Sequence, residues 1–145
     1  MMTAEERKAF VRRQIEELWN KGNLHAAKEC FTKDFVSHDP GPQEVRGPEG
    51  FAENVAAVRS AFPDWHLEIV DQVAEGEKVV TRYVATGTQE GEMAGIPPTG
   101  NRIEIAGMGI DYFRGGKIRE SWEYYDVMGM MQQLGAIPYP EEQPV

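Results

Sequence analysis

The residues of this chain with the clearest potential for chemistry are concentrated in the segment 116–135, where two of the three carboxylates stand directly beside aromatic side chains. These carboxylates are Glu123 and Asp126. A carboxyl group in apolar surroundings keeps its proton to a higher pH, which suits it to acid–base work such as removing a proton α to a carbonyl. The same group on the surface is only a solvated charge. The residue types alone allow both interpretations.

The local pattern assigns the two carboxylates to different elements. Residues 117–125 follow the turn Gly115-Gly116 and favour a strand, because their apolar and aromatic side chains fit a pleated surface. On a strand, Ser121, Glu123 and Tyr125 point to one side and the even-numbered residues to the other.

Asp126 stands where the cap of a C-terminal helix belongs. Apolar residues follow it at helical spacing, namely Met128, Met130, Met131 and Leu134. Gly135 suits the position after the last turn. An aspartate at the N-cap accepts a hydrogen bond from a free backbone N–H of the first turn. We therefore expect a structural Asp126.

His38 is a further candidate, at the end of a short strand predicted over 35–38 and before the turn Asp39-Pro40-Gly41-Pro42. It is either an acid, base or donor in a cavity, or a hydrogen-bonded structural residue. The three histidines and the single cysteine are scattered, without a His-x-x-His or Cys pair, so no metal site is predicted. The sequence also lacks a nucleophile elbow and a phosphate loop, and we expect no cofactor.

Helical patterns fill the first part of the chain and strand patterns the rest. Thr3 and Glu6 form a capping box before an apolar stripe that ends at Gly22. Further helices are predicted over 24–31 and 48–62, and strands over 66–74, 78–88, 102–113 and 117–125. Residues 89–100 read as a Gly- and Pro-rich loop. One domain is predicted over 1–136, followed by a Pro-rich tail over 137–145.

Helices followed by strands with tight turns indicate an α+β domain with an antiparallel sheet. Three helices can cover only one face of this sheet. A strongly twisted sheet covered on one face tends to enclose a cavity. The outer face still carries apolar and aromatic side chains, so we expect a second copy of the chain to bury it, in a homodimer or a higher homo-oligomer.

The net charge of −9 over 145 residues restricts the partners. Nucleic acids and anionic membranes are held by clustered basic residues, whereas the 15 Lys and Arg residues here are scattered, so neither partner is expected. No apolar run approaches the roughly 18 residues of a membrane span. The N-terminus is charged and amphipathic rather than signal-like. The expected location is the cytoplasm.

Motifs over most of the chain from residue 34 onward resemble one family. They are Phe35–Pro40, Gly47–Phe51, Phe62–Asp64, Gly87–Gln89, Gly95–Gly100, Phe113–Ile118, and Trp122, Asp126, Gly129 and Gln133–Gly135. The order of elements resembles the nuclear-transport-factor-2-like superfamily, and within it the SnoaL-like polyketide cyclase (ester cyclase) group. The resemblance implies a cone-shaped, strongly curved, mostly antiparallel sheet with three helices covering its concave face, plus a short C-terminal helix.

The resemblance also implies a site. Cyclases of this group use one Asp on the last strand for an aldol closure without metal or cofactor, and that position falls on Glu123. Glu123 would abstract a proton α to a carbonyl of a small apolar substrate, while His38 or Tyr125 stabilises the enolate. The expected ligand pocket is lined by Trp19, Phe51, Val55, Trp65, Arg82, Tyr83, Met93, Ile96, Met108 and Ser121.

Two departures from the group keep other functions open. A His of the preceding strand is missing from Met108–Asp111, and Gln89 stands where the wider group commonly has His. One alternative is a hydrolase or dehydratase of the epoxide-hydrolase type, in which Arg82, Glu123 and Asp111 approximate an Asp-Arg-Asp arrangement. Another is a ligand-binding dimeric module without turnover. Glu123 would then be a structural ion-pair partner of Arg82 or Arg102.

Overall fold

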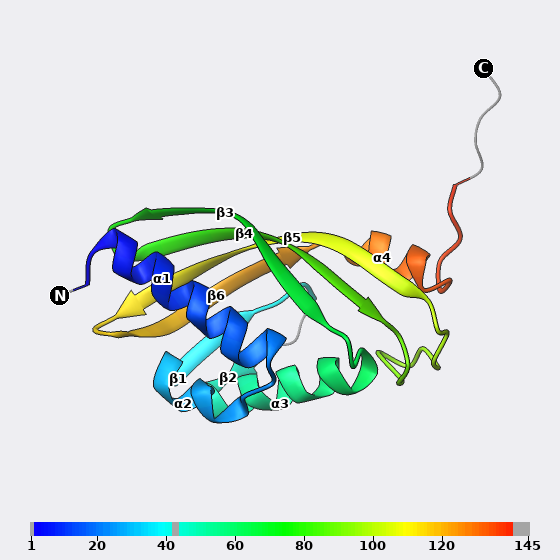
Figure 1. The fold of residues 1–145 in the computed structure, drawn as a ribbon, viewed down its shortest axis with the longest axis horizontal. Coiled ribbons are helices and arrows are strands. Elements are labelled where there is room, and N and C mark those ends of the chain that lie inside the picture. The colour runs from blue at the N-terminus through cyan, green and yellow to red at the C-terminus, as the bar shows by residue number, and fades with distance from the viewer. Residues whose placement is uncertain (1, 42–43, 141–145) are drawn as a thin grey trace, which may run out of the picture.

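The computed structural model describes residues 2–41 and 44–140, which form a single curved sheet with helices on one side (Figure 1). The strands are β1 (Phe31–His38), β2 (Glu44–Arg46), β3 (His66–Glu75), β4 (Lys78–Thr88), β5 (Arg102–Arg114) and β6 (Lys117–Tyr125). Their order is β2-β1-β6-β5-β4-β3. β1 and β6 run parallel, and the other neighbouring strands are antiparallel.

The helices are α1 (Ala4–Gln14), η1 (Ile15–Asn20), η2 (Leu24–Ala26), α2 (Ala27–Cys30), α3 (Gly47–Ala61) and α4 (Val127–Gln133). α1 packs on β3 and β4, and α3 packs on β1, so that these helices and α2 cover the concave face. α4 lies beyond them against β5 (Figure 1). The expected α+β cone with a mostly antiparallel sheet is confirmed.

The N-terminal caps of the first and the last helix are formed as the sequence predicts. Thr3 accepts a hydrogen bond from the backbone N–H of Glu6, whose carboxylate accepts one from the backbone N–H of Thr3, which completes the capping box. Asp126 accepts from the N–H of Gly129 at 2.8 Å and caps α4. A cap of this kind stabilises a helix by about 1 kcal/mol.

The first helix changes its winding before it ends. Residues 15–20 form a π-helix, η1, whose backbone hydrogen bonds span one residue more than those of an α-helix. Asn20 closes this segment, because its side-chain amide donates to the carbonyl of Leu67 and its side-chain oxygen accepts from the N–H of Leu67. The Arg59 guanidinium of α3 donates to the carbonyls of Trp19 and Asn20 at 2.8 and 3.1 Å. The π-helix is therefore fixed to both α3 and β3.

A buried apolar layer joins the helices to the sheet. Val11 and Leu18 from the first helix are fully buried, as are Val55 of α3 and Phe62 just after it. Burial of one such side chain contributes about 1.5–3 kcal/mol. This apolar layer holds the helices against the concave face of the sheet.

The loop between β4 and β5 is organised by one buried side chain. The Gln89 amide group donates to the carbonyls of Gly91 and Ile96, both at 3.1 Å. Its oxygen accepts from the hydroxyl and the N–H of Thr99 at 2.7 and 3.2 Å. Gln89 is fully buried. The loop that carries Met93 is thus held in one shape.

Some of the local structure differs from the prediction. β1 begins at Phe31 rather than at residue 35, and β2 was not predicted. β2 is three residues long and pairs only with β1, so it is too short to show a period in the sequence. Pro42 of the predicted turn and residues 141–145 of the predicted tail lie outside the described residues. No helix in the described ranges is long and apolar enough to cross a membrane.

Candidate active site

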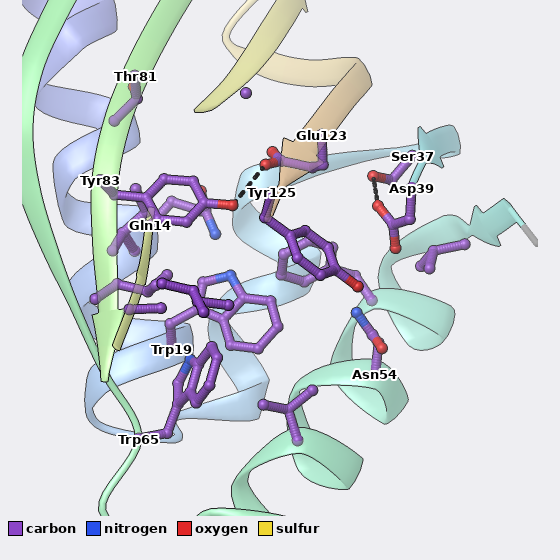
Figure 2. Close-up of a pocket in the computed structure, with 18 of the residues that line it drawn as sticks. Gln14, Trp19, Ser37, Asp39, Asn54, Trp65, Thr81, Tyr83, Glu123 and Tyr125 are labelled. Carbon is purple, nitrogen blue, oxygen red and sulfur yellow. Dashed lines mark hydrogen bonds between the residues drawn. The ribbon is translucent and has the colours of Figure 1, made fainter. Parts of the chain in front are cut away.

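A cavity of about 170 Å³ lies between the helices and the concave face of the sheet. Its walls are largely apolar and aromatic, and a smaller set of polar side chains points into it (Figure 2). The polar side chains are Gln14, Ser37, Asp39, Asn54, Thr81, Tyr83, Asp111, Glu123 and Tyr125. A mostly apolar hollow with a few convergent polar groups is the usual form of a small-molecule site.

Glu123 of β6 and Tyr83 of β4 face one another across β5 (Figure 2). The Tyr83 hydroxyl donates to Glu123 Oε2 at 3.3 Å. Both side chains lie over glycines of the strand between them. A Cβ atom at Gly107 would lie 2.6 Å from the Tyr83 hydroxyl oxygen, and a Cβ at Gly109 would lie 2.6 Å from Glu123 Cδ. The alternating glycines of β5 therefore make room for this carboxylate–phenol pair.

A second carboxyl group lies beside Glu123 on the same inner face. Asp111 is two residues beyond Gly109 on β5 and pairs in register with Ser121. The Ser121 hydroxyl donates to Asp111 at 2.5 Å. Burial raises the pKa of Asp111 to about 6, although the hydrogen bond from Ser121 opposes this shift. Asp111 therefore titrates close to neutral pH.

The pKa of Glu123 is raised well above its ordinary value. Burial is the largest cause, followed by the negative charges of Asp111 and Asp39. The hydrogen bond from Tyr83 acts in the opposite direction, because it stabilises the charged form. A buried carboxyl whose pKa is raised in this way is a candidate for proton exchange with a substrate.

A third carboxyl group occupies another part of the cavity. Asp39 follows β1 and accepts a hydrogen bond from the Ser37 hydroxyl at 3.0 Å. Burial raises its pKa. The Tyr125 hydroxyl is directed toward the side of the cavity where Asn54 of α3 and Asp39 lie (Figure 2). Burial also raises the pKa of Tyr125, so its hydroxyl keeps its proton and remains a donor.

Two indole rings form the remaining wall. The ring centroids of Trp19 and Trp65 are 6.2 Å apart, and Phe51 meets Trp19 edge to face at 5.7 Å. Arg59, which holds the backbone of Trp19, also reaches the Trp65 carbonyl at 3.5 Å. The Trp65 Nε1–H is buried without a hydrogen-bond partner in the described part of the chain. The two indole planes are inclined by 48°, so the rings form an apolar corner rather than one flat surface.

Comparisons with known proteins decide the family. The family model described as SnoaL-like polyketide cyclase matches residues 9–134. The chain belongs to this family. The expectation drawn from the sequence motifs is confirmed.

Individual relatives agree with the SnoaL-like assignment. The chain is 34% identical to the aklanonic acid methyl ester cyclase AcmA of Streptomyces galilaeus, over 92% of each chain. It is 33% identical to the nogalonic acid methyl ester cyclase of Streptomyces nogalater, over 86% of this chain and 94% of that one.

The structure of TsrD from Streptomyces laurentii superimposes with a TM-score of 0.85 at 26% identity, over 94% of this chain and all of that one. A Catenulispora acidiphila protein described as having a ketosteroid isomerase-like fold superimposes with a TM-score of 0.74 at 18% identity, over 86% of this chain and 92% of that one.

Of the three residues expected to take part in the chemistry of a SnoaL-like site, only two lie in the cavity. Glu123 and Tyr125 line the cavity. His38 does not, because it lies on the opposite face of the sheet, where its ring stacks on Trp122 at 3.8 Å. Its ring nitrogens are both 2.9 Å from carboxylates, those of Glu44 and Glu120. The expectation that His38 reaches the cavity is therefore corrected.

Only some of the residues expected to line the pocket do so. The aromatic and apolar residues Trp19, Phe51, Trp65, Tyr83 and Met93 line the cavity. Five others do not line it: Val55, Arg82, Ile96, Met108 and Ser121. Val55 belongs to the core, Met108 is 44% exposed on the outer face, and Arg82 is exposed there too. Ser121 is buried behind Asp111, and Ile96 forms a bridge to Met93 within the loop.

Several polar residues of the cavity were not predicted as site residues. They are Gln14, Ser37, Asp39, Asn54 and Thr81. Asp111 was considered only as a member of an Asp-Arg-Asp arrangement, and that arrangement is not formed because Arg82 points away. Strand alternation could have placed Thr81 beside Tyr83, two residues away. No sequence signal marks Asn54 or Gln14, which sit on helices whose rotation depends on packing.

Proposed function

We propose that this protein catalyses a cofactor-independent ring closure of a polyketide-type carbonyl compound, with Glu123 as the general base. The observation that carries the proposal is the position of Glu123, which faces an apolar cavity and has a raised pKa. Membership of the SnoaL-like family and the activities named for two relatives support a cyclase.

The proposed reaction is an intramolecular aldol addition. The Glu123 carboxylate removes a proton from the carbon α to a carbonyl, and an enolate forms. The enolate carbon attacks a second carbonyl of the same molecule, so that one carbon–carbon bond forms and the second C=O becomes an alkoxide. A proton returns to the alkoxide from the protonated Glu123 or from solvent. No electrons are gained or lost overall.

The surroundings of Glu123 support this role. Tyr83 holds one carboxylate oxygen, which limits the orientations of the base. Tyr125 is two residues from Glu123 on the same face of β6, and its protonated hydroxyl is available to donate to the enolate oxygen. We therefore assign to Tyr125 the donor role that the sequence left open between Tyr125 and His38.

The relatives suggest the kind of substrate. Both are named for acid methyl esters, aklanonic and nogalonic acid methyl ester, and the tilted rings of Trp19 and Trp65 would contact an apolar part of such a substrate. An apolar protein cavity of roughly 150 Å³ holds one benzene molecule. The cavity here has about 170 Å³, so a substrate much larger than benzene would be enclosed only at its reacting end and would extend beyond the cavity.

A substitution of the base tests the proposal. Glu123→Gln keeps the shape of the side chain but cannot accept the proton. With aklanonic acid methyl ester as substrate, we expect kcat to fall by about 10³-fold, within the range for loss of a general base. Glu68→Gln, on the exposed outer side of β3, is the matched control and should keep full activity. If Glu123→Gln and the wild type have equal kcat while both are folded, the proposal fails.

We also propose that two copies pair through the outer face of the sheet. Large apolar side chains on this face are well exposed: Val73 at 61%, Met108 at 44%, Trp122 at 38% and Tyr124 at 63%. The net charge of −9 opposes the association of two copies, and burial of this apolar patch would offset that repulsion. Sedimentation velocity should show a dimer for the wild type and a monomer for the variant carrying Met108→Lys and Tyr124→Lys. A monomeric wild type would contradict this proposal.

A further inference from the structure

One polar side chain interrupts the buried apolar stripe of the first helix. Val11, Ile15 and Leu18 form this stripe, each with an exposed fraction of 7% or less. Gln14 stands among them at helical spacing and is only 5% exposed. Its side chain lines the cavity, on the wall where α1 packs against β3 and β4 (Figure 2). The chain therefore has an amide at a position where helix packing alone favours an apolar residue.

The amide of Gln14 has no hydrogen-bond partner among the described residues, and Figure 2 shows none to the other residues drawn. Gln89, the other buried glutamine of the described ranges, forms four hydrogen bonds. A buried amide without a partner costs about 1–3 kcal/mol. The Trp65 Nε1–H also lacks a partner but is closed off, whereas the Gln14 amide opens to the cavity. The Gln14 amide is therefore available to a ligand.

Most of the other donors around the cavity are already engaged. The hydroxyl groups that donate to its carboxylates are those of Ser37, Tyr83 and Ser121. The Thr81 hydroxyl oxygen accepts from the amide of Gln72 on β3. The Tyr125 hydroxyl is directed toward the side of the cavity where Asn54 of α3 lies (Figure 2). Gln14 is thus the uncommitted amide donor on the α1 side.

The proposed ring closure places negative charge on two oxygen atoms in turn. The enolate oxygen has Tyr125 as its donor, whereas the attacked carbonyl, which becomes an alkoxide, still lacks one. We propose that the side-chain amide of Gln14 donates a hydrogen bond to the oxygen of the attacked carbonyl. An amide N–H stabilises an alkoxide without giving up its proton. The identity of this carbonyl rests on the proposed function, but the hydrogen bond itself requires only binding.

Two small probes test whether Gln14 binds a carbonyl oxygen. Acetophenone and α-methylstyrene have the same shape and differ only in C=O against C=CH₂. Both are somewhat larger than benzene, which suits a cavity of about 170 Å³. Gln14→Met keeps the length of the side chain and removes the amide. By ligand-observed NMR on the full chain, we expect this variant to bind acetophenone about three- to tenfold more weakly and α-methylstyrene as the wild type does.

Thermal unfolding separates a binding role from a structural one. Because Gln14 bonds to no described residue, Gln14→Met should unfold at the wild-type temperature or above it. Gln132→Met makes the same exchange on α4, outside the cavity, and should leave both affinities unchanged. A lower unfolding temperature together with equal weakening of both probes would show that Gln14 only packs, and would overturn the proposal.

Steady-state kinetics tests the role in ring closure. With aklanonic acid methyl ester as substrate, loss of one donor to the alkoxide lowers kcat by about 10²-fold, and we expect this loss in Gln14→Met. The acidic limb of the pH profile should stay in place, since Gln14 is not among the groups that shift the pKa of Glu123. Unchanged kcat in an active wild-type background would overturn the assignment to the attacked carbonyl.

The binding outcomes are decisive without turnover. Wild-type affinity for acetophenone in a folded Gln14→Met variant would overturn the hydrogen bond, as would a wild type that does not bind acetophenone at its solubility limit. If Glu123→Gln keeps full activity while Gln14→Met loses affinity for acetophenone alone, the proposed base fails and Gln14 remains a carbonyl-binding residue. The two proposals can therefore fail separately.

Discussion

The carboxylate of Glu123 occupies the space that a side chain at Gly109 would fill. The two residues are paired in register on β6 and β5. The conformation of Gly109 does not require a glycine, because no positive φ is found there. The glycine is needed for space alone, since even one methyl group would overlap the carboxylate. Gly109 therefore helps to position the carboxylate of Glu123, the proposed base.

Gly109→Ala tests this relationship. The added Cβ displaces the Glu123 carboxylate by about 1 Å, and a misplacement of this size lowers a rate by roughly 10²-fold. We expect kcat to fall by that factor while thermal unfolding changes little. Gly116→Ala, where a Cβ would meet nothing within 4 Å, is the control and should keep its activity. Unchanged kcat in Gly109→Ala would show that the carboxylate can move without cost.

Asp111→Asn should change stability in a pH-dependent way. The folded-state pKa of Asp111 is about 6, above its ordinary value of 3.8, so the folded protein holds this proton more tightly than the unfolded chain. The wild type therefore loses stability as pH rises from about 4 to about 6, and the variant does not. We expect Asp111→Asn to be more stable than the wild type above pH 7, by on the order of 2 kcal/mol. Urea unfolding at pH 4.5 and 8 measures the difference, and an equal effect at both pH values would contradict it.

Asp111→Asn and Tyr83→Phe should move the pH profile of kcat/KM in opposite directions. Activity requires the ionised Glu123, so it rises with pH through the pKa of that group. Loss of the Asp111 charge lowers this pKa and moves the acidic limb to lower pH. Loss of the Tyr83 hydroxyl raises the pKa and moves the limb to higher pH. Tyr124→Phe on the outer face is the control for the hydroxyl. Shifts of the same sign would rule out Glu123 as the titrating group.

Gln89→Ala should loosen the loop 89–100. It leaves the carbonyls of Gly91 and Ile96 and both donors of Thr99 without their partner. Each unsatisfied buried group costs about 1–3 kcal/mol, but water can enter the gap, so we expect a loss of about 2–4 kcal/mol in unfolding free energy. KM should rise more than kcat falls, because Met93 of this loop lines the cavity. Guanidinium unfolding and steady-state kinetics measure the two effects, and a loss below 1 kcal/mol would contradict the role of Gln89.

The sequence predicts the parts of the site that depend on local pattern. Strand alternation puts Glu123 and Tyr125 on one face, and the cap position accounts for Asp126. Both inferences need only neighbouring residues. The family resemblance then supplies which face is inside.

The parts that failed depend on long-range packing. The side of the sheet on which His38 lies is set by the parallel pairing of β1 with β6, which aligns Ser37 with Ser121 and His38 with Trp122. No local pattern contains this register. The π-helix that carries Trp19 and the rotation of α3 that turns Asn54 inward arise in the same way, from contacts between distant segments.

The expectation that Arg82 lines the pocket failed for a different reason. The alternation of β4 already separates Arg82 from its neighbours Thr81 and Tyr83, which both face the cavity. The expected pocket includes Arg82, but this side chain does not line the cavity. In this sheet the apolar residues on the side of Arg82 belong to the uncovered face.

The parallel pairing of β1 with β6 has a consequence for the order of folding. β3 to β6 form a meander of antiparallel neighbours, so Tyr83, Asp111 and Glu123 come together through contacts between adjacent hairpins. Asp39 and Asn54 join them only when β1, on which α3 packs, closes a chain loop of some 80 residues onto β6. Contacts across such separations form slowly because the loop entropy is lost first. The acid–base groups should thus be assembled before the walls that give them a dry environment exist, and the chain acquires its tuned carboxyl groups only in the last step of folding.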